Sequence, residues 1–405
     1  MRCNPKGIVF SMTKFQFFRR NEASASSDQQ RKASDEACAA MGGFSAHKAS
    51  EAVESTQFRQ YNKCTGHGYT AEDVNALHDY LLGNDVKKTG WDNSLNGPDR
   101  IVNGVKVQVK YCNSARGSVN AFFDGANGQC RYPGQVLEVP LDQYDEALRI
   151  MQEKIRNGQV PGVDNPADAA KIVRPGSVTY DQAVKITKVG NWESLKFDVK
   201  NQAVVTSVAG GISFVIAFLM AKKNGLPNFQ AVKFAGKEAA QMGVATMATG
   251  VATQQLLRTG VGRNVLALTE RGVKRGMDAA MKTTMGKKLI EKTGSAVAKR
   301  VVAGQAAKQV ATRAASSNVV TAAVAGVVTS VPDTCRVLSG RISGKEYAIR
   351  MAERGAGIGG GTAGTWAGMA IGSCICPGVG TAIGGFIGGM LGGIGGSTAA
   401  SKCLR

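Results

Sequence analysis

The C-terminal segment from Gly355 to Ser401 is the feature that most constrains the fold of this 405-residue chain. It contains no charged residue, and glycine recurs at every fourth position, at 360, 364, 368 and 372 and again at 380, 384, 388, 392 and 396. Each glycine destabilises an isolated helix in water by about 1 kcal/mol relative to alanine. In a bilayer, small residues at this spacing allow helices to approach closely. The pattern therefore predicts a membrane hairpin of two glycine-zipper helices over 355–401, turning at CICPG (374–378).

A second uncharged stretch, AVVTSVAGGISFVIAFLMA, covers residues 203–221 and is long enough to cross a hydrocarbon core as a helix. From Lys200 to Arg354 the chain has 23 Lys/Arg against 7 Asp/Glu. We therefore predict a basic helical region over 201–354, with a membrane segment near 203–221 and its positive charge on the cytoplasmic side. The alternative is a soluble Ala/Gly-rich bundle that hides these segments in its interior.

The formal net charge of +20 predicts a polyanionic partner, either nucleic acid or an anionic membrane surface. This charge belongs to the second half of the chain, because residues 1–199 hold 25 Lys/Arg against 23 Asp/Glu. The nine cysteines lack CxxC spacing, and with only three histidines they argue against a structural zinc site. Their irregular spacing is typical of a reducing compartment, and the N-terminus does not have the pattern of a signal peptide.

The first 60 residues are rich in Ser, Ala, Gln and charge, with no sustained apolar period, and are predicted to be a flexible tail or an isolated helix. Residues 61–160 have a different pattern, in which a helix beginning at TAEDV is followed by a hairpin, a strand at VLEVP and a further helix ending near Gly158. This order predicts a small α/β domain, followed by a linker and helix over 161–200. The whole chain is thus expected to be α+β and then all-α.

The hairpin holds the most informative polar residues. Asn103-Gly104 favours a type I′ turn, because both residues accept positive φ. That turn places Asp99 opposite Gln108, with Lys110 on the same face by the period of two. An acid, an amide oxygen and a lysine on rigid strands are groups that metal-assisted phosphodiester hydrolysis uses.

The motif formed by Pro98-Asp99 and Gln108-Val109-Lys110 resembles the PD-(D/E)xK nuclease signature, in the variant with Gln in place of the second acid, as in Mrr-type restriction endonucleases. The resemblance runs from the helix at Tyr69 to the helix ending near Gly158. It implies a restriction-endonuclease-like fold with Mg²⁺ or Mn²⁺ as cofactor.

By the same resemblance, Asp99 and Gln108 would bind the metal and Lys110 would be catalytic. Glu72, on the preceding helix, would complete the metal site, with Asp73 as the alternative acid. Gln108 departs from the common pattern, because an amide brings no charge to the metal. Glu138 and Gln143 are further candidates for contact with a substrate.

The first hypothesis is therefore a membrane-anchored, metal-dependent endonuclease whose nuclease-like domain is cytoplasmic and acts on nucleic acid, DNA in the first place. Such a protein would suit a defence or toxin effector, and its zipper helices would favour a homo-oligomer. The second hypothesis is a membrane-permeabilising glycine-zipper effector whose α/β domain is a non-catalytic sensor. A third is an anchor that tethers DNA to the membrane without cutting it.

Overall fold

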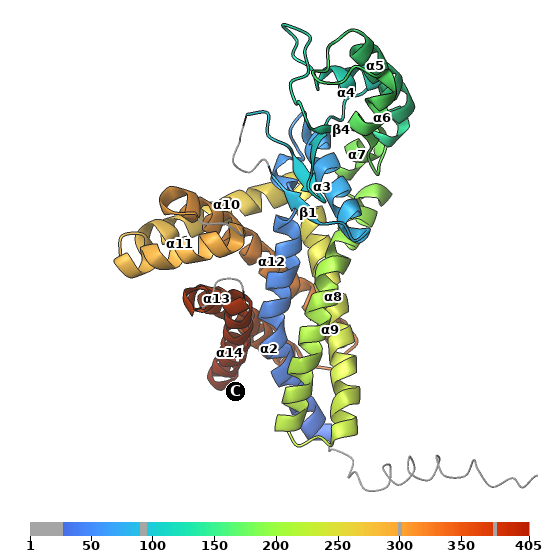
Figure 1. Ribbon diagram of the computed structural model, residues 1–405. Coiled ribbons are helices and arrows are strands. Elements are labelled where there is room, and N and C mark those ends of the chain that lie inside the picture. Colours follow the sequence, from blue (N-terminus) through green and yellow to red (C-terminus); the bar gives the residue numbers. More distant parts are fainter. Residues whose placement is uncertain (1–26, 90–94, 299–301, 376–378, 405) are drawn as a thin grey trace, which may run out of the picture.

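The computed structural model describes residues 27–89, 95–298, 302–375 and 379–404, and it is elongated (Figure 1). A small α/β unit, residues 58–186, forms one end. The other part, the helical region, consists, within the described residues, of one helix that precedes this unit in the sequence and seven that follow it. Two of its helices project sideways from the long axis of the molecule.

The α/β unit is built on a five-stranded mixed sheet. Its strands lie in the order β1 (Val86–Lys88), β2 (Arg100–Val102), β3 (Val105–Val109), β4 (Val136–Val139) and β5 (Val173–Pro175). β1, β2 and β3 pair antiparallel, whereas β3, β4 and β5 pair parallel. The helices are α3 (Gly66–Leu81), α4 (Ala115–Asn120), α5 (Tyr144–Arg156), α6 (Ala169–Ile172) and α7 (Tyr180–Ile186), with 3-10 turns at Phe58–Gln60, Leu141–Gln143 and Pro166–Asp168.

The predicted hairpin register is confirmed. Asn103 and Gly104 have φ values of 49° and 84°, as the turn requires, and Val102 pairs with Val105. Val107 is fully buried, whereas Val105, beside the turn, is 48% exposed. β3 therefore becomes buried over Val107–Val109, the part of the strand that pairs with β4.

The core of the α/β unit lies between α4, α5 and strands β4 and β5, and includes Phe122, Leu137, Met151 and Val173. β5 completes the sheet, α6 joins this core and α7 packs against α3, so the unit extends beyond residue 160. The residues predicted to be a linker supply its fifth strand.

The helical region contains α2 (Ser27–Glu54), α8 (Trp192–Lys223), α9 (Asn228–Arg258), α10 (Gly260–Ala280), α11 (Thr284–Ala298), α12 (Gly304–Leu338), α13 (Gly344–Ile375) and α14 (Val379–Leu404). α2 lies against α8, α9, α12, α13 and α14. The prediction of a flexible tail or isolated helix is therefore wrong for residues 27–54, and residues 1–26 lie outside the described part. With neighbours on several sides, α2 buries small residues around its circumference and has no single apolar stripe.

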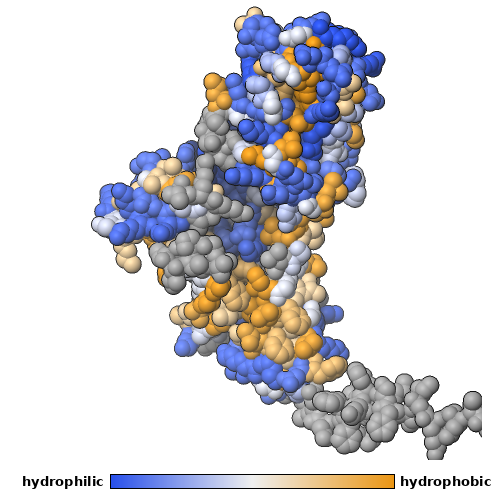
Figure 2. All heavy atoms as spheres, in the orientation of Figure 1, coloured by the Kyte–Doolittle hydropathy of each residue, from blue (hydrophilic) through white to orange (hydrophobic). Residues whose placement is uncertain are grey.

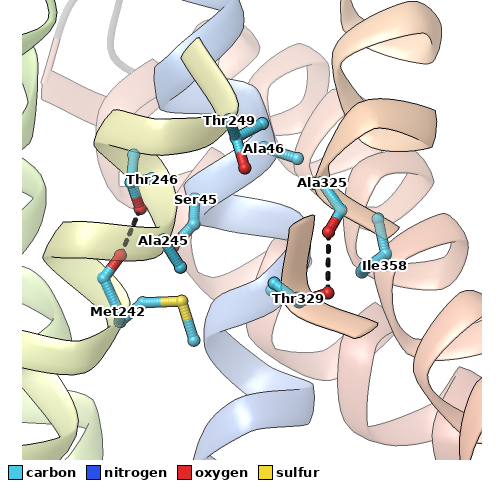
Figure 3. A pocket seen from close by; sticks show the side chains of 10 residues that line it. Ser45, Ala46, Met242, Ala245, Thr246, Thr249, Ala325, Thr329 and Ile358 are labelled. Carbon is cyan, nitrogen blue, oxygen red and sulfur yellow. Dashed lines mark hydrogen bonds between the residues drawn. The ribbon is translucent and has the colours of Figure 1, made fainter. Parts of the chain in front are cut away.

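Hydroxyl side chains line the space between α2, α9, α12 and α13 (Figure 3). The Thr246 hydroxyl donates to the Met242 carbonyl and the Thr329 hydroxyl to the Ala325 carbonyl, each at 2.7 Å. Ser45 Oγ is buried in this pocket and has no hydrogen-bond partner among the described residues. Small and hydroxyl-bearing residues thus allow these helices to lie close together.

The two glycine-rich helices form a closely packed antiparallel pair. A Cβ atom added at Gly364 would collide with the backbone carbonyl of Gly388, and one added at Gly360 with that of Gly392. Gly361 meets Gly43 of α2 in the same way. The predicted close approach of the glycine rows is present, while part of the predicted turn, residues 376–378, lies outside the described residues.

Among the described residues, length and composition allow one helix, Gly304–Leu338, to cross a membrane. A second span is obtained if the bent pair Trp192–Ser207 and Ala209–Lys223, which contains the predicted segment 203–221, counts as one. The described parts of α13 and α14 are not among these candidates. Membrane placement of the glycine-rich pair therefore stays a prediction.

Candidate functional site

The residues singled out by the sequence meet at one end of the hairpin. Gln108, on β3, donates from Nε2 to Asp99 Oδ2 at 2.8 Å, and the Val109 backbone N–H donates to the same oxygen at 2.7 Å. Glu72 extends from α3, and its Oε2 accepts a hydrogen bond from Gln57 Nε2 at 2.6 Å. Asp99, Gln108 and Glu72 are thus brought together as predicted from the hairpin register and the preceding helix.

The two carboxyl groups of this cluster destabilise one another's charge. Burial and the nearby Asp99 raise the pKa of Glu72 to about 8, from its ordinary value of 4.5. Burial also raises the pKa of Asp99, although the Val109 N–H and the Lys110 charge oppose this. Gln108 Oε1 is buried and accepts no hydrogen bond from the described residues. The cluster therefore favours the binding of a proton or of a small cation.

Asp73, the alternative to Glu72, is used elsewhere. Its Oδ2 accepts hydrogen bonds from the Tyr61 hydroxyl at 2.7 Å and from the Gln57 backbone N–H at 2.5 Å, and it pairs with Lys88. Lys110 Nζ lies 4.8 Å from the centre of the Tyr132 ring. Asp73 thus ties α3 to the chain that follows α2, and the Lys110 ammonium rests on an aromatic face.

Arg100 is the residue that the interpretation of the sequence missed. It is 1% exposed and makes ion pairs with Asp79 and Glu138, including Nη2–Asp79 Oδ2 at 2.9 Å and Nη1–Glu138 Oε2 at 2.9 Å. Asn75 also donates to Glu138, at 2.6 Å. The sequence held a signal for the burial of Arg100, because the hairpin register places this residue opposite Val107, on the buried face.

Neither further substrate-contact candidate is free for that role. Glu138 is fully buried and held by Arg100. Gln143 accepts a hydrogen bond from the Ser118 hydroxyl at 3.0 Å and donates to the Cys112 carbonyl at 2.9 Å. Both side chains therefore stabilise the fold of the α/β unit.

The chemistry of the donors allows a limited test of the expected metal. Two carboxyl groups and the unpartnered Gln108 Oε1 are hard oxygen ligands of the kind that Mg²⁺ binds. Within the described ranges, however, no group of three or more His, Cys, Asp or Glu residues is placed to hold a metal ion. Binding of Mg²⁺ or Mn²⁺ at this cluster therefore stays a prediction.

Replacing Glu72 with glutamine is expected to flatten the pH dependence of stability. Because the pKa of Glu72 in the folded protein lies above its ordinary value, its contribution to stability is complete below about pH 4.5 and is lost as pH rises through about 8. Each unit of pKa difference corresponds to about 1.4 kcal/mol. Urea unfolding in EDTA, at about pH 5 and about pH 8, should show a smaller loss for the variant. Equal losses in Glu72→Gln and in the surface control Glu146→Gln would contradict this assignment.

Comparisons with known proteins concern the same part of the chain. The family model described as the YeeR C-terminal domain matches residues 47–156, which cover the end of α2 and the α/β unit as far as α5. "Inner membrane protein YeeR" of Escherichia coli (strain K12) is 46% identical over 99 residues, 24% of this chain and 19% of the relative. No solved structure matches the chain.

These similarities change the interpretation of the sequence. The signature was read as that of an endonuclease, but the segment that carries it matches a domain named for an inner membrane protein. The prediction that the principal function is that of an endonuclease is therefore wrong. The match agrees better with the second hypothesis, a membrane protein with a non-catalytic α/β unit. Residues 47–156 of this chain are thus similar to the YeeR C-terminal domain, and the match to the inner membrane protein covers about a fifth of that relative's length.

Proposed function

We propose that this protein acts on a membrane, with a helical region that enters and permeabilises the bilayer and an α/β unit that senses a ligand without catalysis. The observation that carries the proposal is a band of exposed apolar side chains on the helical region. Figure 2 shows this band below the projecting helices, with hydrophilic residues above it and again at the lower tip. The inner-membrane name of the relative supports the same reading.

The apolar band is drawn from several helices. Exposed apolar side chains of the helical region include Val215 and Leu219 of α8, Val244 of α9, and Ile387 and Leu391 of α14, each 44% to 70% exposed. Exposed apolar surface gathered from several helices is typical of a membrane or protein contact. Lys222 and Lys223 follow the uncharged stretch of α8, the position at which basic residues flank a membrane segment, and Lys223 pairs with Glu36 at 3.1 Å.

The sensing part of the proposal rests on how the acidic cluster is joined to the helices. Gln57, three residues after the end of α2, contacts two of the acids of α3, Glu72 through its side chain and Asp73 through its backbone. Because α2 lies at the centre of the helical region, a proton or cation bound at Glu72 and Asp99 would act on that region through Gln57.

A second connection fixes the other side of the α/β unit. Arg258, at the end of α9, donates to the Ile186 carbonyl at 2.9 Å and pairs with buried Asp198 of α8 at 2.7 Å. Since Ile186 ends α7, this arginine joins the α/β unit to the α8–α9 hairpin. A conformational change of the α/β unit on ligand binding can therefore be transmitted both to α2, through Gln57, and to the α8–α9 hairpin, through Arg258.

The experiment is release of an encapsulated dye from liposomes by the purified full-length protein. Release is expected from wild type and should persist in Lys110→Ala, since that lysine has no catalytic role in this proposal. Recovery of the protein in the soluble fraction, with the dye retained in intact vesicles, would contradict a membrane function. Release that is lost in Lys110→Ala, with folding intact, would contradict a non-catalytic α/β unit.

A further inference from the structure

The two projecting helices, α10 and α11, form an arm with its own surface chemistry. They run across the long axis of α2, α8 and α9, at the level between the α/β unit and the apolar band (Figure 1, Figure 2). The arm packs against α9, α12 and α13, with Leu266 and Ile290 buried and Glu270 paired with Arg59 at 3.2 Å. Other side chains of α10 and α11 are exposed and form its free surface.

An apolar row occupies part of this free surface. At 100° per residue, Val261, Val265 and Leu268 fall on one face of α10, away from buried Leu266. They are 68%, 41% and 63% exposed. On α11, Met285 and Leu289 stand one turn apart and are 82% and 40% exposed. A helix that packs only within its own chain would bury such residues.

Positive charge flanks the apolar row. Residues 260–298 contain eight Lys/Arg against three Asp/Glu. All three acids are engaged: Glu270 with Arg59, Asp278 with Lys308 at 2.7 Å, and Glu291 with the Gly304 N–H at 3.0 Å. Over the part of the chain that the structure covers, no ion pair is formed by the exposed cations Arg271, Arg275, Lys287, Lys288 and Lys292. The outer face of the arm is therefore cationic and partly apolar.

We infer that the arm lies on an anionic lipid surface, where its basic side chains bind phospholipid phosphates and its apolar row enters the headgroup layer. This inference rests on the proposed membrane function and adds the lipid class. A cationic helix with an adjoining apolar row is the pattern of interfacial membrane helices. A nucleic acid would satisfy the cations, but it would leave Leu268 and Met285 in water, so lipid is the better match.

The test is flotation of the full chain with phosphatidylcholine vesicles, with or without phosphatidylglycerol. The arm variant combines Arg275→Glu, Lys287→Glu and Lys288→Glu. Its control makes the same charge change at exposed positions outside the arm, with Lys106→Glu, Arg156→Glu and Lys188→Glu. Leu268→Ser, compared with Leu82→Ser at a residue of similar exposure, probes the apolar row. Circular dichroism confirms that each variant is folded.

Wild type and both controls should bind the phosphatidylglycerol vesicles more tightly, and salt should weaken this binding. The arm variant should lose affinity on the order of 100-fold, because each basic residue at an anionic surface contributes roughly five-fold. If wild type bound both vesicles equally, or if the arm variant bound like its control, the inference that the arm binds anionic lipid would be overturned, while the proposed membrane function would stand. The inference would also be overturned if the arm variant lost duplex DNA or RNA binding while its vesicle binding stayed unchanged. Wild type that binds neither vesicle would overturn the proposed function itself.

Discussion

Replacing Gly364 with alanine is expected to separate α13 from α14, to destabilise the helical region and to reduce dye release from liposomes. An added Cβ at this position would lie 2.0 Å from the backbone carbonyl oxygen of Gly388. Because the obstructing atom belongs to the backbone, no side chain can rotate away, and one helix must move. Overpacking of this kind costs typically 1–3 kcal/mol, and a rigid backbone obstacle places the expected loss at the upper end. Thermal unfolding of the full chain measures the loss directly.

The same helix supplies a matched control. Gly359 is exposed, and an added Cβ there meets nothing within 4 Å in the described residues. Gly359→Ala is therefore expected to stabilise α13 by up to about 1 kcal/mol, from helix propensity alone. If the alanine variants at 359 and 364 unfold at the same temperature, the glycine rows do not hold the pair together.

Replacing Arg100 with methionine is expected to destabilise the α/β unit by about 3–5 kcal/mol. The guanidinium faces two buried carboxylates, Asp79 at 4% and Glu138 at 0% side-chain exposure. Methionine fills much of the volume but leaves both negative charges without their main partner. The loss should be visible in urea unfolding of the full chain, followed by a probe in the α/β unit.

The control for Arg100 is Arg149→Met, which removes an exposed ion pair with Glu146. Exposed pairs contribute about 0–1 kcal/mol, so this variant should unfold close to wild type. A difference between the two variants of less than about 1 kcal/mol would contradict the structural role of Arg100, because an exposed pair alone can account for that amount.

The hairpin was predictable because its determinants are local. Two residues that accept positive φ fix the turn, and the period of two then fixes which side chains share a face. Asp99 and Gln108 therefore met as expected. The same register placed Arg100 on the buried face, but its partners come from α3 and β4, which lie far away in the sequence.

The central position of α2 was not predictable from a periodic pattern. A helix with one buried face shows an apolar stripe, whereas α2 is surrounded and buries alanine, glycine and serine on several sides. Its composition resembles that of a solvated segment. Likewise, the short nuclease signature specified which groups meet, but not that Asp99, Glu72 and Lys110 would each be held by neighbours within the fold.

The sequence by itself determined the hairpin, the acidic cluster at its end and the close approach of the two glycine rows, because turn geometry, strand period and glycine spacing act within short stretches of chain. Only the tertiary structure decided that α2 lies at the centre of the helical region, that residues beyond 160 complete the sheet and that α10 and α11 project as a cationic arm. Those outcomes depend on burial between segments far apart in the chain, where small residues fit by shape and leave no periodic signal.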